Sequence, residues 1–221
     1  MPLFTLTPVE TRLLGCLLEK ERITPENYPL SLNSLIAACN QSTNRDPITA
    51  YDARTVEAGL DGLRQKKLAV MIMSAGSRVA KFRHEMLNHF DLSPREVALL
   101  CVLLLRGPQT LGELRSRTER IQFFDSLEQI ESFLAELAKE EPPLVRLLPA
   151  RPGQKESRYV QLLSGEPVMP ETAAVAVTAS PPAEGVTDNS RLETMEKQLA
   201  ELTAELRDLR EELLSFRKQF E

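Results

Sequence analysis

The sequence contains no tryptophan, only 5% aromatic residues and only two histidines, His84 and His89. Apolar residues still make up 42% of its 221 residues, so we expect leucine-rich aliphatic cores in one or two domains. With so few histidines a Ser or Cys nucleophile lacks a partner base, and neither histidine belongs to a pattern with zinc-site spacing. Glycine-rich phosphate loops and the G-x-S-x-G motif are also missing. We therefore predict a protein that is not an enzyme, with no catalytic residues and no metal or cofactor.

Cysteine is scarce as well, and long hydrophobic runs are lacking. Cys16, Cys39 and Cys101 are odd in number and have no C-x-x-C spacing, which is typical of reduced thiols in the core of a cytoplasmic protein. The N-terminus shows no signal-peptide pattern. The longest apolar run, residues 97–105, is far shorter than the ~20 residues that a membrane span needs. The sequence therefore predicts a cytoplasmic protein without a membrane segment.

One pattern occurs twice in the chain. Residues 6–10 (LTPVE) and 92–96 (LSPRE) each supply a hydroxyl N-cap, a proline at the first helical position and a glutamate three residues past the cap. Leucines spaced for one helical face follow in both places, at positions 13, 14, 17 and 18 and at 99, 100, 103 and 104. An internal repeat of this kind predicts one structural unit built twice.

The order of predicted elements is also the same in the two copies. In the first, helices at about 7–22, 31–39 and 52–67 precede strands at 68–73 and 79–83. In the second, helices at about 94–106, 110–114 and 126–139 precede strands at 144–148 and 158–162. Three helices and then a hairpin is the order of a winged helix, whose third helix contacts DNA and whose hairpin forms the wing. We predict a mostly helical α+β protein with winged-helix domains at 1–90 and 91–164.

The C-terminal part of the sequence has a different character. Residues 165–190 are rich in Pro, Ala, Thr and Val without a period, which indicates a flexible linker. Residues 191–221 carry an apolar heptad seam, which predicts a coiled coil that joins two copies of the chain. A single helix that folds back on the rest of the chain is the alternative. The seam consists of Leu192, Met195, Leu199, Leu202, Leu206, Leu209, Leu213 and Phe216, and continues to Phe220.

Charge is distributed unevenly along the chain, whose net charge is −5. Residues 1–90 hold 11 basic and 9 acidic residues, residues 91–164 hold 10 and 11, and residues 165–221 hold 6 and 12. Residues 62–84 contain no acidic residue, and basic side chains on a wing typically contact the phosphate backbone. The nucleic-acid contacts predicted for the first copy are Arg45, Arg54, Arg64, Lys66, Lys67, Arg78, Lys81 and Arg83.

The outer face of the predicted third helix holds Arg54, Ala58, Asp61 and Gln65, of which Arg54 and Gln65 can reach base edges. The alternative is a solvated face that is basic without a ligand. The third helix of the second copy instead exposes Glu128, Glu131, Glu136 and Glu140, which do not suit a major groove. Two hypotheses follow. One is a DNA-binding protein related to transcription, and the other is an adaptor that binds a protein partner through its winged-helix surfaces and coiled coil.

Residues 40–47 (NQSTNRDP), followed by Tyr51-Asp52 and preceded by the LTPVE and LLEK segments, resemble the YceH-like proteins. The resemblance covers about residues 4–164. It implies tandem winged-helix domains in a bacterial cytoplasmic protein, and it brings no catalytic residues. Two interpretations of this loop remain. Asn44 and Arg45 contact phosphate, or the polar side chains satisfy backbone groups at a helix end and turn.

Overall fold

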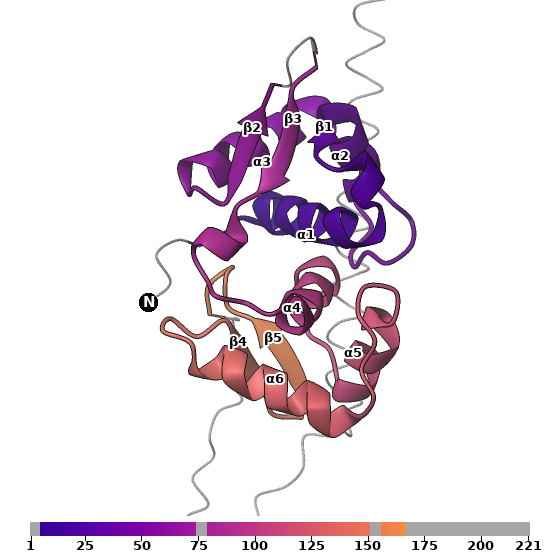
Figure 1. Ribbon diagram of the computed structural model, residues 1–221, viewed down its shortest axis with the longest axis vertical. Coiled ribbons are helices and arrows are strands. Elements are labelled where there is room, and N and C mark those ends of the chain that lie inside the picture. The colour runs from indigo at the N-terminus through magenta and orange to yellow at the C-terminus, as the bar shows by residue number, and fades with distance from the viewer. Residues whose placement is uncertain (1–4, 74–78, 151–155, 167–221) are drawn as a thin grey trace, which may run out of the picture. The chain divides into compact units, whose positions relative to one another are not determined.

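The computed structural model describes residues 5–73, 79–150 and 156–166, all of which belong to one compact unit (Figure 1). Arg78 and the predicted coiled coil with its seam residues lie outside the described part, as does almost all of the predicted linker. The described residues contain six α-helices and two small antiparallel sheets, so a mostly helical α+β architecture is confirmed.

The first copy of the repeat contains α1 (Pro8–Ile23), α2 (Leu32–Cys39) and α3 (Ala53–Gln65), followed by strands β2 (Ala69–Ile72) and β3 (Lys81–His84). Two 3₁₀ turns, η1 (Pro25–Asn27) and η2 (Met86–Asn88), lie in its connections. A two-residue strand that the sequence did not predict, β1 (Leu30–Ser31), pairs with β3 and gives the sheet the order β1-β3-β2.

The second copy repeats this order. It contains α4 (Pro94–Arg106), α5 (Leu111–Thr118) and α6 (Leu127–Lys139), followed by the hairpin of β4 (Val145–Leu148) and β5 (Arg158–Gln161). The predicted helix starts are confirmed, because Thr7 and Ser93 each cap a helix within a complete capping box. Ser31, Asp52, Thr110 and Ser126 cap the remaining four helices.

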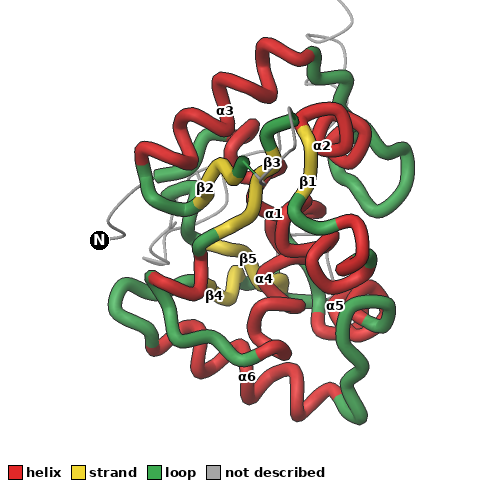
Figure 2. Tube along the Cα trace, turned by 45° about the horizontal axis from the view of Figure 1, so that its top comes forward, coloured by secondary structure: helices red, strands yellow, loops and turns green. Residues whose placement is uncertain are grey.

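The two copies pack through their first helices. Figures 1 and 2 show α1 and α4 in the middle of the described unit, with α3 and α6 at opposite ends. Gly15 permits this approach, because a Cβ there would lie 2.8 Å from a methyl carbon of Leu105 and 3.2 Å from Cβ of Leu104. The Cys101 thiol donates to the Gly15 carbonyl at 3.5 Å. One aliphatic core therefore runs through both copies, and the division into two domains at residue 90 stays a prediction.

Candidate nucleic-acid interface

Helix α3 is held against α1 by its apolar face, with Val56, Leu60 and Leu63 buried. Gly59 brings the two helices close, because a Cβ at this position would lie 2.6 Å from a methyl carbon of Leu13. The helix begins at the Asp52 cap, whose carboxylate accepts from the Thr55 amide at 2.8 Å. The opposite face of α3 is left to solvent, and its predicted outer residues Arg54, Ala58, Asp61 and Gln65 are all exposed.

The strands β2 and β3 follow directly from α3. Lys67 adopts a left-handed conformation with φ of 59°, and the Leu68 amide then bonds to the Leu63 carbonyl at 2.8 Å. This turn ends α3 and leads into β2, which pairs with β3 in antiparallel register from Ala69 opposite His84 to Ile72 opposite Lys81. The end of α3 and the two strands thus bring the predicted basic residues onto neighbouring elements.

The predicted cations differ in how they are compensated. Arg64 pairs with Asp61 and Arg83 with Glu85, each at 2.8 Å, and Lys66 pairs with the buried Glu10. Of the remaining predicted contacts in the described ranges, three form no ion pair: Arg54 on α3, Lys67 at its end and Lys81 at the start of β3. Arg54 and Lys67 are exposed and Lys81 is partly exposed, so these three side chains are available to a phosphate.

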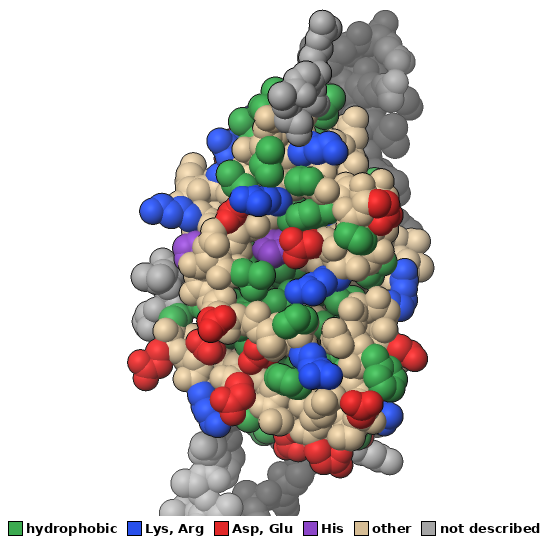
Figure 3. Space-filling model, viewed as in Figure 1, with side chains coloured by type: hydrophobic (Ala, Val, Ile, Leu, Met, Phe, Trp, Pro, Cys, Tyr) green, Lys and Arg blue, Asp and Glu red, His purple; other side chains and the backbone are tan. Residues whose placement is uncertain are grey.

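The space-filling view shows the same contrast between the two copies. In Figure 3 basic side chains are prominent over the half that holds β2 and β3, and acidic side chains are prominent over the half that holds α6. Helix α6 exposes Glu128, Glu131 and Glu136, and Lys139 pairs with Glu136 at 2.8 Å. In the second hairpin Arg146 pairs with Glu166, and Arg158 pairs with Glu113 at 2.7 Å.

Arg45 does not belong to this interface, contrary to the expectation of a phosphate contact. Its side chain has no exposed area and forms a bidentate pair with Glu19, at 3.0 and 2.6 Å. Its remaining donors bond to the carbonyls of Ala38 and Asn44 and to the side chain of Gln41. All five guanidinium donors are therefore used inside the protein, and none remains for a nucleic acid.

The buried pair keeps both groups ionised. Burial raises the pKa of Glu19, but the hydrogen bonds and charge of Arg45, together with Lys20, outweigh it and hold that pKa below its ordinary value. Burial would lower the pKa of Arg45, and the hydrogen bonds and charge of Glu19 instead keep it raised. The pair fixes the loop of residues 40–47 to α1. Of the two interpretations of this loop, Arg45 therefore follows the one in which its polar side chains hold the loop in place and do not contact phosphate.

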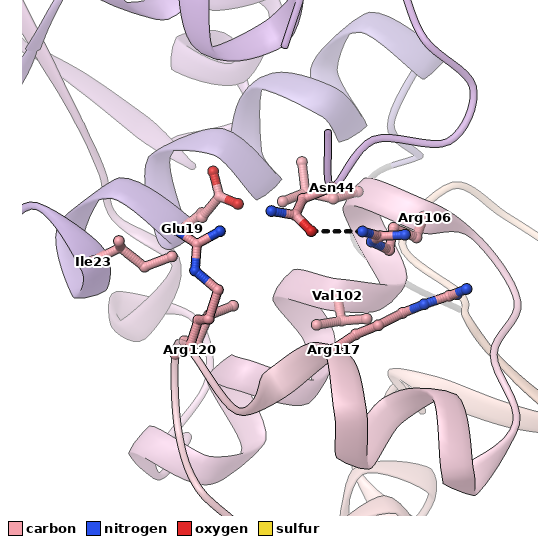
Figure 4. Close-up of a pocket in the computed structure, with 9 residues that line it drawn as sticks. Glu19, Ile23, Asn44, Val102, Arg106, Arg117 and Arg120 are labelled. Atoms are coloured by element: carbon pink, nitrogen blue, oxygen red, sulfur yellow. Dashed lines mark hydrogen bonds between the residues drawn. The ribbon is translucent and has the colours of Figure 1, made fainter. Parts of the chain in front are cut away.

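The same loop also contacts the second copy. Arg106 of α4 donates to the side chain of Asn44 at 2.6 Å, and the Asp46 amide bonds to the Leu105 carbonyl at 3.0 Å. Figure 4 shows this contact beside a small cavity, with Glu19 and Arg120 on its other side. The cavity measures about 20 Å³, which is room for about one water molecule and not for a larger ligand.

Sequence reasoning did not predict the buried charges of α1, among which Arg12 lacks a counter-charge. Arg12 of α1 is only 4% exposed, and one of its terminal nitrogens has no hydrogen-bond partner. The helical period places Arg12 on the side of α1 opposite the leucine face, so both its burial and its missing partner could be found only from the structure. No group of three or more His, Cys, Asp or Glu side chains in the described ranges is placed to hold a metal ion.

Comparison with known proteins places the chain in a class. A family model described as "Protein of unknown function, DUF480" matches residues 6–154, so the chain belongs to this family of uncharacterised bacterial proteins. UPF0502 protein GSU0233 of Geobacter sulfurreducens is 47% identical over 216 residues, with 98% of both chains covered. A UPF0502 protein of Citrifermentans bemidjiense is 54% identical over 170 residues, covering 77% of this chain and 79% of its own. Within the described residues, no helix is both long enough and apolar enough to cross a membrane.

Proposed function

We propose that the two copies of the repeat are winged-helix domains and that the first binds duplex DNA, with α3 in the major groove and the hairpin along the phosphate backbone. The observation that supports this most is the set of three uncompensated cations, Arg54, Lys67 and Lys81, on α3 and the adjoining β3. The proposed role is non-enzymatic. The basic side chains increase the affinity for DNA because counterions are released from the phosphates that they contact.

The predicted heptad seam adds a second part to the proposal. A parallel dimer through residues 191–221 presents two copies of α3 to one duplex, and such a pairing of half-sites is how small modules gain affinity and specificity. Light scattering of the full chain and of a chain that ends at residue 166 tests this part. A dimer is expected for the full chain and a monomer for the shorter one. The same number of chains per particle in both contradicts this part of the proposal.

The main test is the salt dependence of DNA binding. In the triple variant Arg54→Ala, Lys67→Ala, Lys81→Ala the slope of log affinity against log salt should become shallower by about one unit for each phosphate that is no longer neutralised. The matched control removes three exposed cations of the second copy, Arg115, Arg120 and Lys139, and should leave the slope unchanged. Absence of binding at low salt in the wild type, or an equal reduction in both variants, contradicts the proposal.

A small increase in DNA affinity is expected when an acidic residue on the same face of α3 is neutralised. Asp61→Asn removes a negative charge from the exposed side of α3 and releases Arg64 from its ion pair. Because exposed charge interactions contribute ~0–1 kcal/mol, duplex affinity at low salt should rise about twofold. The control is Glu131→Gln on α6, which should have no effect on affinity. Unchanged affinity for Asp61→Asn would mean that this face of α3 does not touch the duplex.

A specific observation also favours the adaptor hypothesis for the second copy. Leu127 and Leu147 are exposed beside a cavity of about 450 Å³ that Leu111, Glu131 and Tyr159 also line. An apolar groove with acidic residues at its edge suits a partner segment with apolar and basic side chains. A stoichiometric protein partner that still binds the triple variant above and no longer binds Leu127→Lys supports this alternative. Retention of that partner by Leu127→Lys contradicts it.

A further inference from the structure

A second cavity lies where the two copies of the repeat meet. It measures about 310 Å³ and is bounded by the start of α1, the segment 46–51 that leads into α3, the end of α4 and the residues after β5. Its wall is mostly apolar, with contributions from Leu6, Pro8, Pro47, Leu103 and Leu104. This volume and this lining are within the range of pockets that hold small molecules.

Arg12 gives this cavity its unusual feature. Arg12 lines the wall, is almost fully buried and forms no ion pair with any described residue. One terminal nitrogen donates to the Pro47 carbonyl at 2.5 Å, and the other has no partner. A buried cation of this kind costs several kcal/mol unless an anion compensates it, as Glu19 does for Arg45. The structure therefore contains a positive site that lacks its counter-charge.

Apart from Asp46, the other polar groups of the wall are neutral donors and acceptors. The Thr11 and Ser164 hydroxyls lie 2.7 Å apart, and the Gln161 amide donates to Ser164 at 2.8 Å. The one acid that lines the cavity, Asp46, is exposed and does not pair with Arg12. Its charge disfavours a ligand with two negative charges, whereas a single negative charge beside Arg12 is stabilised.

We propose that this cavity binds a small organic monocarboxylate with an apolar body. The carboxylate pairs with the guanidinium of Arg12, and the apolar body lies against Leu6, Leu103 and Leu104. A phosphate fits less well, because it carries more negative charge beside the exposed Asp46 on the same wall. The site does not depend on the proposed DNA binding, since neither Arg54, Lys67 nor Lys81 lines it.

The test uses the full chain and titration calorimetry with four probes: 4-methylpentanoate, its neutral methyl ester, isoamylamine and inorganic phosphate. Saturable binding of 4-methylpentanoate is expected, with no binding of the ester or of the amine. The ester probe requires no variant, so it tests the need for a negative charge even if a substitution impairs folding. The proposal is overturned if the carboxylate does not saturate by about 10 mM, or if the ester, amine or phosphate binds as tightly.

A variant then assigns the binding to this residue. Arg12→Met should weaken carboxylate binding by at least about tenfold, while Arg54→Met, which changes an exposed arginine of α3, should leave it unchanged. Arg12→Met should also unfold at an equal or higher temperature than the wild type, because it removes an uncompensated buried charge. Undiminished carboxylate binding by Arg12→Met overturns the assignment.

Discussion

The first helices of the two copies begin with the same capping box and differ in what they bury. Helix α1 buries four polar or charged residues, Glu10, Thr11, Arg12 and Glu19, whereas α4 buries an unbroken apolar segment, Val97–Leu105. When the two repeats are aligned on their caps, Glu19 corresponds to Leu105 and Arg12 to Ala98. The same backbone unit therefore has an interior with ion pairs in one copy and a purely aliphatic first helix in the other.

The same divergence is found on the surface. Helices α3 and α6 occupy equivalent places in the order of elements, yet α3 and its hairpin leave cations uncompensated, and α6 exposes glutamates. The comparison teaches that caps and leucine spacing specify the repeated backbone, while each copy is free to carry its own charges. Function is therefore expected to belong to one copy and not to be shared equally.

The largest expected loss of stability comes from a substitution that makes α1 resemble α4. Glu19→Leu places the residue of the second copy in the first and leaves Arg45 buried without a counter-charge. Removal of one partner from a buried ion pair costs about 3–5 kcal/mol, so the free energy of unfolding in urea should fall by that amount.

The double variant Glu19→Leu, Arg45→Met provides the control for this change. It should recover most of the stability, because an apolar pair of similar volume replaces the ionic one. Glu57→Gln, on the exposed face of α3, should change the stability by less than about 0.5 kcal/mol. A decrease below about 1 kcal/mol for Glu19→Leu alone would show that Arg45 does not depend on this carboxylate.

A smaller loss of folding stability is expected when the pH is lowered. Burial raises the pKa of Glu10 and of Glu19, but the lysine and arginine partners outweigh it, and both carboxyls have pKa values below the ordinary 4.5. Their contribution to stability is complete above pH 4.5 and is lost as the pH falls through their lowered pKa values. Urea unfolding between pH 6 and pH 3 measures this decrease, which should be smaller in the Glu19→Leu, Arg45→Met variant. An identical pH profile in both proteins contradicts the assignment to Glu19.

The smallest expected effect concerns two helical glycines, one in each copy. Gly59→Ala in α3 forces a methyl group to within 2.6 Å of a Leu13 carbon and 2.7 Å of a Val9 carbon, and should cost about 1–3 kcal/mol. Gly112→Ala in α5 finds open space, with its closest neighbour at 4.0 Å, and should stabilise by up to about 1 kcal/mol. Thermal unfolding measures both, and equal shifts would contradict the close packing of α3 on α1.

The helices could be predicted because their signals are local. The Thr7 and Ser93 caps, the prolines beside them and the leucine spacing lie within a few residues of the helices that they start. Strand β1 could not be predicted, since two residues form a strand only when β3, about fifty positions later, pairs with them.

In the candidate site, too, local features could be predicted from the sequence and features that depend on distant residues could not. The exposure of Arg54 and Gln65 follows from the helical period of α3, and the structure has both exposed. The burial of Arg45 does not follow from its polar surroundings in the sequence, because its partner Glu19 is 26 residues away. The cavity around Arg12 combines residues from both copies, so no local pattern could have shown it.

The contact between Cys101 and Gly15 has a consequence for the symmetry of this fold. The two residues occupy the same position of the repeat when the copies are aligned on their caps, and they touch each other. Contacts between identical positions are the mark of a twofold axis in symmetric dimers. At this contact the two first helices thus meet as equivalent helices of a homodimer would, although both belong to one chain.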